Sequence, residues 1–436
     1  MKETVYEIGK RRELMMDHCL TDFCSDNILL TRHQPIAKEL IPALKNSSYG
    51  TILKMDGIYR FYYRGVVEGY DGPGNDGNPG EYTGVMESRD AVHWEKPVLD
   101  LYPQAAPNAI WFGSDETHNF VPFIDNSPGC PETEKYKAIG GLCKSGGVKR
   151  FYSADGIHWT RYDYPGVYDS MPGSHKTLDS HNVCFWSESE QCYVIYFRYY
   201  ITGSKGQPLR TIARGVSKDF INWSDPVELK INRQDEHLYV SLFAPYFRAP
   251  HFYIATPTRY FEERQSVTDI TMCHTRDGKT ILRPFPDAWI TPGRDPERWG
   301  NRSNYMTYNY LQTSPDEISY YHKSGIRYAL RLDGFASLHA GVESGRWISK
   351  PMRYSGGTLE CNIATSGAGL LRAGIMKEDG SFIEGFSTGD CDEFFGDEIA
   401  MKPTWKGSSI LPLKEGDVFK LCFELKECDL FSFAFQ

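Results

Sequence analysis

Ser153-Ala-Asp-Gly-Ile-His-Trp159 is the clearest copy of a motif, Ser/Thr-x-Asp-Gly-x-x-Trp, that returns along this chain at regular spacing. Other copies, complete or partial, begin at Ser88, Ser217, Thr275 and Arg331, so successive copies lie 56 to 65 residues apart. Spacing of this regularity indicates one supersecondary unit repeated along the chain. We therefore predict an all-β fold, a five-bladed β-propeller in which each repeat builds one blade.

Each repeat contains the same succession of short apolar segments. In the first repeat these segments are 49–54, 58–63 and 82–86, all rich in Tyr, Phe and β-branched residues. Short strands joined by turns predict antiparallel blades. Within the motif, Asp and Gly suit a tight turn and Trp suits packing between blades. We therefore assign the repeated aspartates a structural role, not a catalytic one.

The sequence changes character after Leu338. Apolar and polar residues then alternate, as in 369–376 and 418–425, and Trp becomes rare. Alternation of this kind predicts antiparallel strands that pack face to face. We expect two domains: a propeller over residues 1–345 that carries the site, and an accessory β-sandwich over residues 346–436.

The overall composition excludes several classes of partner. The 436-residue chain has a net charge of −9 and no run rich in Lys and Arg, so we expect no nucleic-acid partner. No segment is apolar for the length of a membrane span, and residues 1–10 lack a signal-peptide core. Eleven scattered cysteines without a CxxC pair fit a reducing compartment. We expect a cytoplasmic protein with no membrane association; the alternative is a periplasmic or secreted protein whose signal peptide has been removed.

Polar residues stand immediately before the first strand of each repeat, where the strands of a propeller converge on its channel. The four clusters are Asp115-Glu-Thr-His118-Asn119, Asp179-Ser-His181-Asn182, Asp235-Glu236-His237 and Asn301-Arg302-Ser-Asn304. Cleavage of a glycosidic bond needs a pair of carboxyl groups, one of which protonates the leaving oxygen. We predict Glu236 and Asp179 as catalytic, with Asp17 as a third candidate. Each has an alternative role as a strand cap, a turn former or an ion-pair partner between blades.

Other polar residues near these strand starts are candidates for substrate binding. They are His118, Asn119, His181, Asn182, His237, Arg248 and Asn304. Arg248 could bind an anionic substituent through its planar guanidinium, or it could pair with Glu236. The histidines lack zinc-ligand spacing, and the acidic loop 71–80 departs from a calcium-loop pattern. We expect no metal and no cofactor.

Several phrases of the sequence resemble five-bladed glycoside hydrolases of family 32 (fructosidases) and family 43 (arabinanases and xylosidases), and most closely a group of family 32-like bacterial proteins. The phrases are Asp179-Ser-His-Asn-Val, Glu236-His-Leu-Tyr, Tyr246-Phe-Arg-Ala-Pro-His, Leu332-Asp-Gly-Phe-Ala-Ser-Leu and Asp429-Leu-Phe-Ser-Phe. The resemblance covers the whole chain and implies a propeller followed by a C-terminal β-sandwich. The family 32 catalytic motifs are absent, and Leu14-Met-Met-Asp17 is the nearest counterpart to the nucleophile motif.

We therefore expect a glycosidase that hydrolyses O-glycosyl bonds, acts at the end of an oligosaccharide or polysaccharide, and has a carbohydrate as its substrate. In this hypothesis Glu236 is the acid/base, and Asp179 or Asp17 is the partnering carboxylate. The alternatives are a glycoside phosphorylase on the same fold, a non-catalytic glycan-binding propeller and, third, a scaffold that binds partners through its rim.

Overall fold

The computed structural model describes residues 5–45, 47–113, 115–169, 177–179 and 181–436. The chain forms two compact units. The propeller unit comprises Pro35–Tyr246 and Pro250–Ala329, and the terminal unit comprises Met1–Gln34, Phe247–Ala249 and Leu330–Gln436. The described residues form strands and short 3-10 helices, which confirms the all-β prediction, and none of them forms a helix long and apolar enough to cross a membrane.

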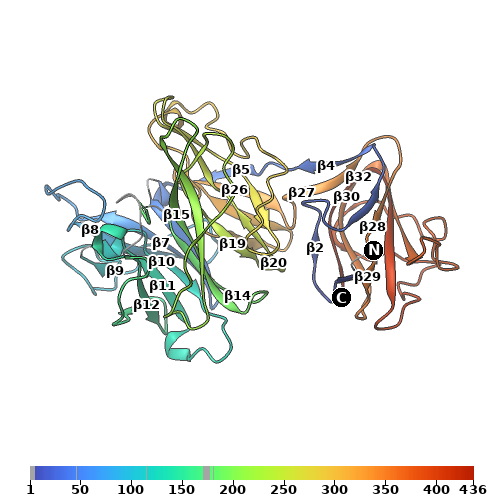
Figure 1. Cartoon of the computed structure of the whole chain (residues 1–436), viewed down its shortest axis with the longest axis horizontal. Helices are drawn as coiled ribbons and strands as arrows, with labels where there is room; N and C mark the ends of the chain where they lie inside the picture. The colour runs from blue at the N-terminus through green and yellow to red at the C-terminus, as the bar shows by residue number, and fades with distance from the viewer. Residues whose placement is uncertain (1–4, 46, 114, 170–176, 180) are drawn as a thin grey trace. The chain divides into compact units, whose positions relative to one another are not determined.

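The propeller unit contains sheets built from successive repeats, which we call blades one to five (Figure 1). Blade one contains β6 (Ser48–Met55), β7 (Ile58–Val66), β8 (Glu81–Ser88) and β9 (Ala109–Phe112). Blade two contains β10 (Val121–Ile124), β11 (Tyr136–Gly140), β12 (Lys149–Ser153) and β13 (Thr160–Arg161). Blade three contains β14 (Val183–Ser187), β15 (Cys192–Thr202), β16 (Pro208–Ser217) and β17 (Val227–Glu228).

Blades four and five depart from this simple order. Blade four is split into two three-stranded sheets: β18 (His237–Leu238) with β21 (Thr258–Phe261) and β22 (Val267–Ile270), and β19 (Phe243–Tyr246) with β20 (Ala249–Ala255) and β23 (Cys273–Thr275). Blade five contains β24 (Leu311–Ser314), β25 (Glu317–Tyr321), β26 (Ile326–Arg331) and, from the N-terminal side of the chain, β5 (Ile36–Leu40). The described part of this unit also contains the 3-10 helices η1 (Pro42–Leu44), η2 (Asp115–Thr117), η3 (Glu132–Glu134), η4 (Cys143–Ser145) and η5 (Pro296–Trp299).

The first strands of successive blades lie next to one another. β6 contacts β10, β10 contacts β14, β14 contacts β19, and β24 returns to β6. The Tyr310 hydroxyl donates to the Ala244 carbonyl at 3.2 Å and so links blades five and four. This circular order is that of a β-propeller, with the inner strands around one axis.

The repeated motif forms the same turn in four blades. One carboxylate oxygen of the motif aspartate accepts the amides two and three residues further on at 2.6–2.9 Å; these residues are Asp90, Asp155, Asp219 and Asp277. In the three complete copies, the Trp indole donates to the carbonyl of the residue after the aspartate at 3.0–3.2 Å. The prediction of a structural role for these aspartates is confirmed.

The aspartate of the fifth copy of the motif has a different setting. Asp333 belongs to the terminal unit and is fully buried. Its Oδ2 accepts the Ser432 hydroxyl at 2.6 Å and the Asn362 amide at 3.2 Å, and it lies 3.3 Å from Arg248 NH1. Asp333 therefore stabilises the terminal unit through contacts with residues that are distant in sequence.

The terminal unit combines strands from both ends of the chain in one hydrogen-bonded network of ten strands. These are β1 (Tyr6–Glu7), β2 (Glu13–Leu14), β3 (Thr21–Cys24), β4 (Ile28–Arg32), β27 (Ala336–Ala340), β28 (Gly345–Ser349), β29 (Met352–Arg353), β30 (Leu359–Lys377), β31 (Asp397–Met401) and β32 (Val418–Phe435). The two long strands β30 and β32 pair along most of their length and enclose one hydrophobic core around Trp347.

The division of the chain differs from the expected boundary at residue 345. Residues 1–34 join the C-terminal strands because β2 pairs with β32 and β4 pairs with β27. Both chain ends therefore lie in the terminal unit (Figure 1). The chain then enters the propeller unit at β5, which pairs with β26 and completes blade five.

Candidate functional site

Three tyrosines stack at the axis of the propeller unit. The rings of Tyr49 and Tyr305 are 6.0 Å apart with an interplanar angle of 22°, and those of Tyr305 and Tyr239 are 5.6 Å apart at 21°. They come from blades one, five and four, each near the start of the blade, because these starts converge on the axis. His181 of blade three meets the Tyr49 ring edge-on at 5.7 Å. Aromatic rings thus form the centre of the candidate site.

His118 stands between two acidic groups beside this stack. Its Nδ1 lies 3.1 Å from Glu81 Oε2, and its Nε2 lies 4.0 Å from Asp179 Oδ1. His118 is fully buried, and the Glu81 side chain is only 3% exposed. Burial raises the pKa of Glu81, but the hydrogen bond to His118 and the charge of Arg64 outweigh it, so the pKa is lowered. Glu81 therefore serves to orient the imidazole.

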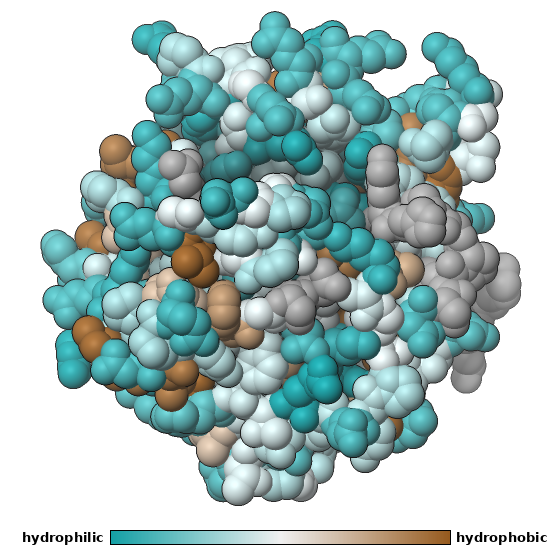
Figure 2. Space-filling view, turned by 90° about the vertical axis from the view of Figure 1, so that its left-hand side faces the viewer, coloured by the Kyte–Doolittle hydropathy of each residue, from teal (hydrophilic) through white to brown (hydrophobic). Residues whose placement is uncertain are grey.

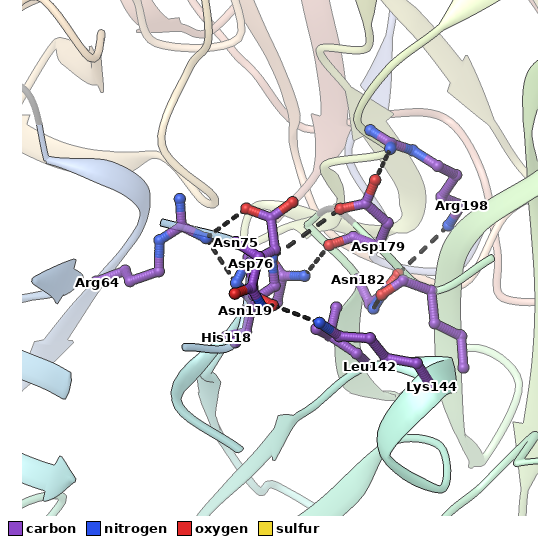
Figure 3. A network of polar contacts seen from close by, with 12 residues as sticks. Arg64, Asn75, Asp76, His118, Asn119, Leu142, Lys144, Asp179, Asn182 and Arg198 are labelled. Atoms are coloured by element: carbon purple, nitrogen blue, oxygen red, sulfur yellow. Dashed lines mark hydrogen bonds and ion pairs between the residues drawn. The ribbon is translucent and has the colours of Figure 1, made fainter. Parts of the chain in front are cut away.

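Asp179 is the partly exposed carboxylate of this group, with 23% of its side chain exposed. Its Oδ2 accepts a hydrogen bond from Arg198 NH1 at 2.7 Å. The Arg198 guanidinium is buried 3.9 Å from the Tyr239 ring centroid. Asn182 accepts the Arg198 amide at 3.3 Å and donates to the Leu178 carbonyl at 2.8 Å. These contacts fix the carboxylate in place, as Figure 3 shows.

A second exposed carboxylate comes from the loop between β7 and β8. Asp76 is 57% exposed, and its Oδ1 lies 3.7 Å from Arg64 NH1. Lys144 donates to the Asp76 carbonyl at 2.6 Å and ties this loop to blade two. In Figure 3, Asp76 and His118 lie between Arg64 on one side and Asp179 with Arg198 on the other.

Asp76, Glu81 and His118 also have the donor set of a metal site, since their ligand atoms lie within 4.8 Å of one another. Arg64 NH1, however, lies 3.7 Å from Asp76, 3.6 Å from Glu81 and 2.6 Å from His118 Nδ1. The guanidinium already supplies a positive charge at the point where these groups converge. Arg64 therefore takes the place of a metal ion in this group, with the buried Glu81 as its counter-charge.

The predicted binding residues of blades two and three lie in this cluster: His118 and Asn119 from blade two, and His181 and Asn182 from blade three. Asn119 donates from its amide to the Asp179 carbonyl oxygen, while its Oδ1 is buried without a hydrogen-bond partner among the described residues. His181 is fully buried, and burial together with the charges of Arg64 and His118 lowers its pKa to about 3. His181 therefore faces the axis as a neutral imidazole.

Glu236 has a different setting from the one the sequence suggested. Its carboxylate is 11% exposed and forms a bidentate pair with Arg283, at 2.6 and 3.1 Å. The Arg233 amide donates to the same carboxylate at 3.0 Å. Arg283 therefore takes the role that was considered for Arg248. Among the described residues, these contacts tie Glu236 to blade four and not to the His118–Asp179 cluster.

Asp17 and Arg248 belong to the terminal unit, whereas the residues of the cluster belong to the propeller unit. Asp17 follows β2 and accepts the Cys19 amide at 2.8 Å. The strand that completes blade five is β5, which pairs with β26. Arg248 lies 3.3 Å from the buried Asp333.

The two remaining predicted residues bind protein groups. The Asn304 side chain accepts from Arg298 Nε at 2.8 Å and donates to the Thr268 and Arg298 carbonyls at 2.7 and 2.8 Å. His237 Nδ1 accepts the Arg210 amide at 3.2 Å. Asn304 therefore stabilises the start of blade five, and His237 joins blades three and four.

Sequence patterns around the first strand of each blade do not reveal Arg64, Glu81 and Arg198, which lie on other strands. In an antiparallel blade, the end of the second strand and the start of the third lie at the same edge as the start of the first. Arg64 is opposite Ser48 and Thr83 in the register of blade one. Once the strand register is known, the same topological rule selects these charged residues.

Comparisons with known proteins give distant similarities. No family model and no curated protein matches the chain. Among solved structures, the chain is similar to a family 43 arabinoxylan arabinofuranohydrolase from Bacillus subtilis (TM-score 0.43, 12% identity, 92% of this chain and 99% of that chain). It is also similar to a β-1,2-mannobiose phosphorylase from Listeria innocua (0.46, 11%, 70% and 95%) and to a glycosyl hydrolase from Bacteroides ovatus (0.45, 8%, 74% and 97%).

Proposed function

We propose that this protein is a carbohydrate-active enzyme that cleaves a glycosidic bond at the axis of its propeller unit. The observation that carries the proposal is Asp179, a partly exposed carboxylate fixed by Arg198 beside stacked tyrosines. Small-molecule sites in proteins typically combine aromatic walls with a few fixed polar groups. A sugar ring presents both a flat face and many hydroxyl groups, so it matches this combination.

Glycosidases use two carboxyl groups on opposite sides of the scissile bond. In the described cluster, Asp179 and Asp76 are the two carboxylates that solvent reaches, whereas Glu81 is buried against His118. We therefore assign the reacting pair to Asp179 and Asp76. Arg198 engages Asp179 Oδ2, which leaves Oδ1 on the side of His118 for the reaction. Glu236 has no part in this step.

One face of the molecule gives little support for a protein partner. The face shown in Figure 2 is mostly hydrophilic, with hydrophobic side chains in small groups. Large apolar patches mark protein-docking surfaces, so this face does not favour the scaffold alternative. The site residues come from several blades and surround the axis, which suits binding of a chain end. The proposed enzyme therefore acts at the end of a glycan chain.

A screen of the wild-type protein against natural oligosaccharides and aryl glycosides tests the proposal, with released sugars measured. We expect turnover of at least one glycan, and we expect Asp179→Asn to abolish it. Binding of glycans with no product across the panel would instead support the non-catalytic alternative. If neither binding nor product is observed, the proposal is wrong.

A further inference from the structure

The strongest feature that the proposed mechanism leaves unused is a pair of cations at blade five. Arg302 is exposed, and Lys323 is partly buried beside it. The Lys323 ammonium donates to the Arg302 carbonyl at 3.3 Å and lies 5.2 Å from the Tyr305 ring centroid. Arg302 NH1 in turn donates to the Tyr239 hydroxyl at 3.2 Å. Both cations therefore border the stacked tyrosines.

The carboxylates of the site are already engaged by other cations. Asp179 pairs with Arg198, and Asp76 and Glu81 both face Arg64. Among the described residues, neither Arg302 nor Lys323 has a carboxylate within ion-pair distance. Two like charges held together without a counter-charge repel each other and raise the affinity for an anion.

Two further observations support an anion at this place. Burial and the charges of Arg302 and Arg64 lower the pKa of Lys323, so the surroundings of its ammonium are electropositive. The hydroxyl of Tyr305, whose side chain lies between the other two tyrosines of the stack, is buried and has no hydrogen-bond partner among the described residues.

The backbone also fixes the position of Arg302. Its φ of 52° lies in the left-handed region, which is unfavourable for a residue with a side chain. The amide of Arg302 donates to the Ser266 carbonyl at 2.8 Å and stabilises this conformation. Its Nε donates to Asn301 Oδ1 at 2.9 Å, so the planar guanidinium is oriented before a ligand arrives.

We propose that Arg302 and Lys323 form a subsite for an oxyanion at the edge of the tyrosine stack. The guanidinium would bind two oxygens of the anion side by side, and the ammonium would supply a point charge. The anion belongs either to the glycan, as the carboxylate of an acidic sugar, or to a separate inorganic phosphate. The existence of the anion subsite does not depend on the proposed function. Only the identity of its ligand, an acidic sugar or a co-substrate of glycan cleavage, rests on that function.

Calorimetric titration of the whole protein tests the subsite without requiring turnover. The probes are sodium phosphate, glucuronate and, as the neutral match, glucose, all at constant ionic strength. We expect wild type to bind phosphate or glucuronate more tightly than glucose. Hydrogen bonds to charged groups are strong enough that Arg302→Gln and Lys323→Met should each weaken anion binding about 10-fold or more. Exposed Arg294→Gln and Lys230→Met are the matched controls and should leave it unchanged.

Preference for phosphate would identify a co-substrate anion, and preference for glucuronate an acidic sugar. Anion binding no tighter than glucose binding, or equal binding by wild type and both site variants, would overturn the subsite. If the protein cleaves a neutral glycan but binds no anion, the subsite fails while the proposed function stands. If it binds an anion through Arg302 and Lys323 but acts on no glycan, the subsite stands and the proposed function fails.

Discussion

Two arginine–carboxylate pairs in the propeller unit show how the surroundings decide what a carboxylate can do. Glu236 uses both of its oxygens for Arg283, and its carboxylate also accepts the Arg233 amide. Asp179 uses one oxygen for Arg198, and its other oxygen faces His118. The first arrangement stabilises blade four, whereas the second leaves an oxygen for a substrate. Sequence position alone made the two residues look equivalent.

We predict that Glu236→Gln lowers the free energy of unfolding by about 2 kcal/mol, because the nearly buried Arg283 guanidinium loses its counter-charge. Denaturant unfolding of the single variants Glu236→Gln and Arg283→Met, and of the double variant, gives the coupling energy of the pair. If the losses of unfolding free energy in the two single variants add up to the loss in the double variant, the role assigned to this pair is wrong.

His181 gives a prediction for the pH dependence of stability. Its pKa in the folded protein is lowered to about 3, so the folded state binds fewer protons than the unfolded state between that pH and the ordinary value of a histidine. Stability is therefore lost as pH falls through this window, by about 1.4 kcal/mol per pH unit for one such group. His181→Gln should remove this contribution from the slope of unfolding free energy measured between about pH 4 and 6.

The matched control for this measurement is His93→Gln. His93 is exposed, and the hydrogen bond to Asp90 raises its pKa instead of lowering it. Its contribution has the opposite sign: it is present at low pH and is lost as pH rises. An unchanged slope in His181→Gln would show that the imidazole is not buried in the neutral form.

At the scale of the element, the repeated turn was predictable, and the charged cluster was not. The spacing of Ser153–Trp159 and its copies indicates both the repeat and the turn, because a local motif determines its own hydrogen bonds. Arg64, Glu81 and Arg198 are brought together by strand pairing across a blade and by the convergence of blades at the axis. Such contacts depend on the register of paired strands and on the order of the blades around the axis. The sequence of a single strand determines neither.

The turn itself predicts a costly substitution. Gly156 has a φ of 74°, and a Cβ there would lie 2.5 Å from Met55 Cε and 2.8 Å from the Tyr62 hydroxyl. We expect Gly156→Ala to lower the free energy of unfolding by about 1–3 kcal/mol through strain and overpacking. Gly57→Ala is the matched control, since its φ is 83° but no atom lies within 4 Å of the added Cβ. Equal costs in the two variants would show that the contacts around Gly156 do not matter.

At the scale of the whole molecule, the chain ends share one unit, and the sequence did not reveal this. The alternation of apolar and polar residues locates the C-terminal strands. The sequence of residues 1–34 does not show that β1, β2, β3 and β4 pair with those strands. Pairing between segments so far apart in sequence depends on the closure of the whole fold.

This arrangement predicts the effect of removing residues 1–34. The strands β27, β28, β29 and β32 would lose hydrogen-bonded neighbours, whereas β5 would still complete blade five. We expect limited proteolysis to cut the terminal unit of the truncated protein first, because unpaired strands open most easily. Equal protection of both units in the truncated and untruncated proteins would contradict this account of the terminal unit.

The central claim is that the functional carboxylate is Asp179 at the axis and not Glu236 in blade four. The most direct test compares kcat/KM and thermal stability of Asp179→Asn and Glu236→Gln on the glycan that the wild-type protein turns over. We predict that Asp179→Asn loses activity about 100-fold or more while remaining folded. Glu236→Gln should keep its activity within about 5-fold while losing stability, since only a stabilising ion pair is weakened. An inactive but fully stable Glu236→Gln, together with an active Asp179→Asn, would contradict the account.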